Sequence, residues 1–270
     1  MKTLKHYLSV SLTICRQSLQ RIVEYKANLL GWLVANPVQF IVGFATIKFV
    51  VEEFGVIDGW DYGQLAFIFG ISVMSHGLNC VFFHSSWMMG YWITRGEFDR
   101  YLLRPLNVLY QFYFMEINLV GFTDMIPGLC ILIYGCIQVG FQPTLRNILS
   151  VAGMIVGATA IRGAVYLILG CTAFWTKSNN PYRGYTQQMF DKTSQYPISI
   201  YPKALQMILT YLIPLGWVSY YPASEFLGKE TELFVGNAAV WTSLVIGIGL
   251  FLLAAVIFNQ GLKQYESAGN

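Results

Sequence analysis

Charged residues are scarce in this sequence. Asp, Glu, Lys and Arg make up 11% of the 270 residues, hydrophobic residues make up 55%, and the mean hydropathy is +0.51. Because a soluble domain carries about 25% charged residues, the composition excludes an ordinary soluble globular protein. Several apolar runs exceed the roughly 20 residues that a helix needs to cross a bilayer. We therefore predict an all-α integral membrane protein.

The motifs of common catalytic and nucleotide-binding sites are also missing. There is no GxxxxGK[ST] phosphate-binding loop, since Gly228 and Lys229 are followed by Glu230 and lack the upstream glycine. No HExxH, no GxSxG and no paired Cys/His metal spacing occurs. We therefore expect no catalytic residues and no metal site, and we expect that the chain does not bind ATP by itself.

Cysteine pairs and a secretory signal are missing as well. No two of the five cysteines are spaced as CxxC, and all lie in stretches predicted to be helical, which favours buried free thiols over metal or redox chemistry. The first 26 residues carry charges throughout and have no continuous apolar core, so no signal peptide is expected. The cysteines are Cys15, Cys80, Cys130, Cys136 and Cys171.

Six membrane spans are predicted, within a single membrane domain over residues 1–270. An amphipathic helix over residues 3–25 precedes them and is expected to lie in the membrane interface. The segment 221–235 is a candidate for a re-entrant or interfacial helix. No loop is long enough to be a separate domain. The predicted spans cover about residues 27–51, 63–93, 112–139, 148–175, 203–220 and 236–258.

The distribution of basic residues predicts the orientation. With the N-terminus in the cytoplasm, 13 of the 17 Lys and Arg fall on the cytoplasmic side, which is a strong positive-inside bias. We therefore expect a multi-pass protein of the cell membrane with both termini in the cytoplasm. The 13 residues are Lys2, Lys5, Arg16, Arg21, Lys26, Arg95, Arg100, Arg104, Lys177, Arg183, Lys192, Lys203 and Lys263.

A few polar residues fall inside the predicted spans. His76 and Asn79 share one helix face with Ser72, and such a face meets other helices more often than lipid. Asp124 and Arg162 are expected near the middle of the bilayer, where an unpaired charge costs several kcal/mol. We predict that these two pair between adjacent antiparallel spans, as a structural ion pair or as a substrate or proton site. Glu116 is expected nearer the inner interface.

The segment 94–111, TRGEFDRYLLRPLNVLYQ, is the longest charged interruption in the first half of the chain. Its charges are interleaved with apolar and aromatic residues, which is typical of a short helix at a membrane surface where a partner can press on it. The alternative is a plain solvated connector. Positive-inside counting places the segment in the cytoplasm, between the second and third spans.

Two stretches resemble the type-2 family of ATP-binding-cassette (ABC) exporter permeases. Residues 96–106, GEFDRYLLRPL, are similar to a pattern of that family, G-x-[LF]-D-x-x-L-[LV]-R-P-[LV]. Residues 196–223, YPISIYPKALQMILTYLIPLGWVSYYPA, resemble its YP…YP…IP…YYP segment. The six-span layout and the N-terminal interfacial helix also agree. The residues that match the first pattern are Gly96, Phe98, Asp99, Leu102, Leu103, Arg104, Pro105 and Leu106.

The resemblance implies a permease subunit without its own ATPase. Separate ABC ATPase subunits, which hold ATP and Mg, would dock on the cytoplasmic face, and two permeases, identical or related, would form the pathway. The segment 94–111 would be the coupling helix, which the ATPase moves as a lever when its dimer closes on ATP. The implied partner-binding residues are Arg95, Gly96, Glu97, Phe98, Asp99, Arg100, Leu102, Leu103, Arg104 and Pro105.

The chemistry of the segment suits such a contact. Phe98, Leu102 and Leu103 are expected to fill a hydrophobic groove of the ATPase, arginines are expected to form charge pairs at the rim, and a proline is expected to end the helix. Two other functions stay open. One is a self-sufficient secondary transporter or channel that uses Asp124, Glu116, Arg162 and His76, and the other is a membrane-embedded enzyme that modifies lipid. The substrate is not predicted.

Overall fold

The structure is a computed structural model that describes residues 20, 26–114, 117–178, 183–229 and 238–266. Over these residues it is helical, and the only extended pairing is an isolated bridge between Ile57 and Trp60. The predicted interfacial helix 3–25, apart from residue 20, and Glu116 lie outside the described residues. So does the last part of the segment 221–235.

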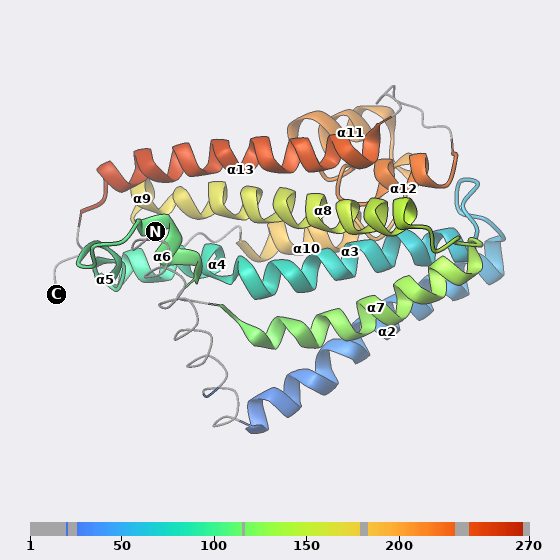
Figure 1. The fold of residues 1–270 in the computed structure, drawn as a ribbon, viewed down its shortest axis with the longest axis horizontal. Coiled ribbons are helices and arrows are strands. Elements are labelled where there is room, and N and C mark those ends of the chain that lie inside the picture. The colour runs from blue at the N-terminus through green and yellow to red at the C-terminus, as the bar shows by residue number, and fades with distance from the viewer. Residues whose placement is uncertain (1–19, 21–25, 115–116, 179–182, 230–237, 267–270) are drawn as a thin grey trace.

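Five helices of the described chain are long and apolar enough to cross a membrane, which confirms a multi-pass membrane protein. They pack side by side into an elongated bundle, with α2 crossing obliquely (Figure 1). α13 ends at the same end of the bundle as α5 (Asp99–Leu102). There the hydroxyl of Tyr265, which follows α13, donates a hydrogen bond to Asp99. The five are α2 (Lys26–Phe54), α3 (Tyr62–Phe82), α7 (Phe122–Gln138), α8 (Leu145–Cys171) and α13 (Ala239–Lys263).

Two of the predicted spans are interrupted. The second breaks at Phe83, which separates α3 from α4 (His84–Thr94). The third predicted span, 112–139, is divided as well: its first residues belong to α6 (Val108–Phe114), and a 3₁₀ turn, η1 (Leu119–Gly121), leads into α7. The fourth continues beyond α8 into a single turn, α9 (Ala173–Thr176).

The predicted fifth span, 203–220, is wrong as a continuous helix. α11 (Lys203–Met207) passes into the π-helical turn η3 (Ile208–Leu212) and stops there. The cause is Pro214, which has no N–H to donate and disfavours helical geometry at the residue before it. Ile213 is accordingly extended, with φ −118° and ψ 96°. The chain resumes a helix only at α12 (Tyr220–Phe226).

A helix that the sequence placed in a cytoplasmic loop lies in the bundle instead. α10 (Arg183–Thr193) packs against α3 and α8, and the 3₁₀ turn η2 (Ile198–Ile200) follows it. Figure 1 shows α10 alongside the middle of these long helices. The region between α9 and α13 is thus built from short helices rather than from one span.

Small residues let the long helices approach closely. A Cβ atom on Gly70 of α3 would lie 2.5 Å from the Leu132 backbone of α7, and a Cβ atom on Gly135 would lie 2.5 Å from the Phe67 backbone. Gly157 of α8 likewise lies close to Ser243 of α13, while Gly153, one turn earlier, makes only ordinary contacts. This packing holds α3 against α7 and α8 against α13 and so positions the polar groups between them.

Candidate functional site

A cavity of about 510 Å³ lies between α2, α3, α4, α7 and α10. The residues of α3 that line it come from its last two turns, and the α7 residue comes from its first turn, so the cavity lies in the half of the bundle nearer α5. Trp32, Phe40 and Trp87 supply apolar walls. Polar side chains in the wall are Asn36, Gln39, His76, His84, Asn118, Asp124, Gln187 and Asp191.

Arg162 lies fully buried in α8 behind this cavity. Its guanidinium donates to the Asp191 carboxylate over 2.9 Å. Three hydroxyls complete the shell, those of Ser72 (2.9 Å), Ser75 (3.1 Å) and Ser194 (2.7 Å). A guanidinium that is removed from water requires such partners at nearly every N–H.

The predicted Asp124–Arg162 pair is therefore wrong, because Arg162 pairs with Asp191. Asp191 lies on α10, and no local sequence pattern predicted that this polar helix enters the bundle. Asp124 instead faces His76, with 3.9 Å between its Oδ2 and the imidazole Nε2. The imidazole Nδ1 lies 2.9 Å from Asp191 Oδ1. Asp124 and Arg162 are thus linked indirectly, through His76 and Asp191.

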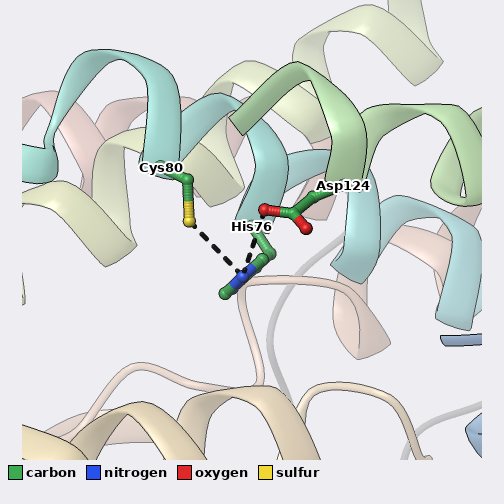
Figure 2. Close-up of side chains that lie close together, drawn as sticks. All are labelled: His76, Cys80 and Asp124. Carbon is green, nitrogen blue, oxygen red and sulfur yellow. Dashed lines mark hydrogen bonds and ion pairs between the residues drawn. The ribbon is translucent and has the colours of Figure 1, made fainter. Parts of the chain in front are cut away.

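Figure 2 shows how the side chains of α3 and α7 converge on this imidazole. His76 and Cys80 stand one turn apart on α3, and Cys80 Sγ lies 3.4 Å from the His76 Nε2. Asp124 reaches toward the same nitrogen from α7. Because Asp191 occupies Nδ1, the two ring nitrogens have different surroundings: Nδ1 faces one carboxylate, and Nε2 faces a thiol and a second carboxylate.

The predicted helix face of His76 and Asn79 is confirmed as buried. His76, Asp124 and Arg162 are brought together, whereas the buried Asn79 side-chain nitrogen has no hydrogen-bond partner among the described residues. Sequence reasoning missed Asp191 and Cys80. The spacing of Cys80, four residues after His76, was the available signal, since it places both on one helix face. Nothing in the sequence marked Asp191.

The segment 94–111 is not one helix. α4 ends at Thr94, Gly96 turns the chain with a φ of +71°, and α5 spans only one turn before the bends that lead to α6. Only glycine adopts such a φ without strain. The buried Gln111 amide then donates to the backbone carbonyls of Tyr101 (3.0 Å) and Leu106 (2.8 Å) and fixes the loop. The helix ends at Leu102, three residues before Pro105.

Phe98 does not point outward, which corrects its expected role in filling a partner's groove. It is fully buried, with ring centroids 5.4 Å from Phe174 of α9 and 5.2 Å from Tyr265 after α13. Leu102 and Leu103 are 44% and 84% exposed. The segment therefore has an apolar root inside the bundle and an apolar tip outside it.

Several charges of the segment make contacts within the chain. The Arg100 guanidinium donates to the Tyr101 hydroxyl over 2.8 Å and lies over the Trp92 ring, while Arg95 lies over the Tyr91 ring. Asp99 accepts the hydrogen bond from Tyr265 over 2.7 Å. Exposed side chains at the tip also include Glu97, Arg104 and Pro105.

The family description "ABC-2 family transporter protein" belongs to a family model that matches residues 38–269. The chain belongs to the ABC-2 transporter family. The match contains the cavity residues of α3, α7 and α10 and the whole of the segment 94–111. A search among curated proteins and a search among solved structures found no match. The chain is thus a multi-pass membrane permease of the ABC transporter class.

Proposed function

We propose that this permease is the membrane subunit of an ATP-driven exporter whose energy comes from separate ATPase subunits. The observation that carries the proposal is the build of the segment 94–111, with an exposed tip at Leu103 and a root at Phe98 buried in the bundle. The sequence contains no phosphate-binding loop of its own. Two permeases, identical or related, would enclose the pathway, and two ATPases would bind at the tips.

The root of the segment explains how a push at the tip reaches the membrane helices. Phe98 contacts Phe174 of α9 and lies 6.3 Å, between ring centroids, from both Phe258 of α13 and Phe112 of α6. Because protein interiors are close-packed, an element anchored in this way does not shift without moving its neighbours. Closure of the ATPase dimer would then move α4, α6, α9 and α13 together.

The cavity fits the inward-facing part of the pathway. It lies in the half of the bundle nearer the segment 94–111, which the positive-inside bias assigns to the cytoplasm. One wall is α10, which is short and is held to α3 and α8 through Asp191. Movement of α10 relative to these helices would open or close the cavity. In this arrangement α10, α11 and α12 together cross the membrane between α9 and α13, which adds a sixth crossing to the five long helices.

Co-purification tests the ATPase contact. A tagged permease is co-expressed with a candidate ABC ATPase subunit, and the amount of ATPase that is retained is measured. Leu103→Asp places a charge at the tip and is expected to lose most of the ATPase, whereas Val56→Asp, in an exposed loop at the opposite end, keeps it. Equal retention by both variants would contradict docking at the segment 94–111.

A further inference from the structure

We propose that His76, Cys80 and Asp124 form a binding site for a borderline-soft divalent cation of the Zn²⁺ type. Among the described residues, these are the three His, Cys or Asp/Glu side chains whose ligand atoms all lie within 4.8 Å of one another. The proposal departs from the expectation of no metal site. A short sequence motif does not reveal this group, because two packed helices assemble it: His76 and Cys80 lie on α3, and Asp124 lies on α7 (Figure 2).

The distances between the ligand atoms suit one ion. Zinc binds thiolate sulfur at about 2.3 Å and imidazole nitrogen at about 2.0–2.1 Å, so a tetrahedral ion separates its ligands by about 3–4 Å. Cys80 Sγ and Asp124 Oδ2 lie 3.4 Å and 3.9 Å from His76 Nε2. An ion placed among them therefore needs only small side-chain rotations, and no movement of α3 against α7.

Asp191 positions the imidazole for this task. It holds Nδ1 at 2.9 Å, which makes Nδ1 the protonated nitrogen and directs the Nε2 lone pair toward Cys80 and Asp124. Metal-bound histidines almost always donate their second N–H to a carboxylate or carbonyl in this manner. Asp191 is itself fixed by Arg162. The site thus has an outer shell that orients its nitrogen ligand.

Three protein ligands leave one position of a tetrahedral ion open. His76, Cys80 and Asp124 all line the cavity of about 510 Å³, so the open position faces this space. A fourth ligand, either water or a donor group of a bound molecule, can enter from the cavity. The Cys80 thiol and the imidazole must be free of protons at the ligand atoms, so binding releases protons to solvent.

Cobalt binding to the purified protein tests the site. The full chain in lipid nanodiscs is treated with a chelator and titrated with Co²⁺, whose thiolate complexes have a near-ultraviolet charge-transfer band. The expected result is one Co²⁺ per chain with this band, displaced by Zn²⁺. Cys80→Ser should remove the band, whereas Cys130→Ser, an exposed free cysteine of α7, should keep it. Asp191→Asn should keep the band but weaken affinity about 10–100-fold.

A measurement on the unmodified chain guards against misfolded variants. Alkylation of Cys80 and of Cys130 is followed peptide by peptide, with and without Zn²⁺. Zn²⁺ should slow the alkylation of Cys80 and leave that of Cys130 unchanged. Equal rates at Cys80 with and without Zn²⁺, or a cobalt band that persists in Cys80→Ser, would overturn the proposal. Equal rates would leave the cluster as a charge network that holds protons but no metal.

Discussion

Replacement of Asp191 by leucine, which leaves no polar group at this position to accept from Arg162, should be among the most destabilising single changes in the bundle. In Asp191→Leu the fully buried guanidinium of Arg162 loses its counter-ion and keeps neutral partners, among them three serine hydroxyls and the Phe190 ring. Breaking a buried ion pair from one side costs about 3–5 kcal/mol, because the remaining charge has neither water nor a counter-ion. Arg162→Met should cost less, since Asp191 retains His76 at 2.9 Å.

The double variant separates this explanation from simple loss of packing. Arg162→Met with Asp191→Leu removes both charges, so the loss should be smaller than the sum of the single losses by about 1–3 kcal/mol. The free energy of unfolding is measured by tryptophan fluorescence in mixed micelles. The matched control is the exposed Lys48–Glu52 pair at 3.6 Å, where Glu52→Gln should cost no more than about 0.5 kcal/mol.

Two outcomes would refute this reasoning. If the losses in Arg162→Met and Asp191→Leu add, the two residues are not coupled in the folded protein. If Asp191→Leu is as mild as Glu52→Gln, α10 is not seated in the bundle. The second result would also mean that the Asp191 carboxylate does not lie beside His76 and does not position its imidazole.

Two further predictions concern the segment 94–111. Phe98→Ala empties a site that is fully enclosed by aromatic rings, so it should cost about 3–5 kcal/mol in unfolding free energy and should weaken ATPase stimulation more than ATPase retention; normal stimulation would show that the root does not transmit movement. Gly96→Ala forces a side chain onto a φ of +71° and should cost about 1–2 kcal/mol, which a melting curve detects, whereas a neutral effect would place the turn elsewhere.

The spans that were predicted correctly are those in which a long, uninterrupted apolar run is sufficient to form a membrane-spanning helix. The first, fourth and sixth predicted spans correspond to α2, to α8 with α9, and to α13. Their length and hydropathy are local properties that a bilayer selects directly. The predicted span 203–220 failed at Pro214, which ends the helix although the apolar run continues past it.

The position of α10 was not predictable from local pattern. Its sequence is polar, and a polar helix enters a bundle only when its charges find partners there. The partners of Asp191 on α10 are Arg162 and His76, which lie 29 and 115 residues before it in the chain. The expected Asp124–Arg162 pair failed for the same reason, because a better-placed carboxylate came from a segment that had been assigned to the cytoplasm.

Whether Phe98 points into the bundle or outward likewise depends on tertiary structure. An apolar residue among charges suits a partner's groove as well as the protein's own interior, and the pattern does not distinguish the two. The rings that enclose Phe98 come from α6, α9 and α13, and only the folded bundle gathers them. Leu103, five residues further along the chain, is the most exposed apolar side chain of the segment.

A photoreactive residue at this tip gives the most direct test of the claim that a separate ATPase drives the permease through the segment 94–111. p-Benzoylphenylalanine replaces Leu103 in one strain and Val56 in another, cells are irradiated, and the cross-linked proteins are identified by mass spectrometry. The account predicts an adduct with a subunit that carries a phosphate-binding loop from position 103 and none from position 56. Such an adduct from position 56 alone would contradict it.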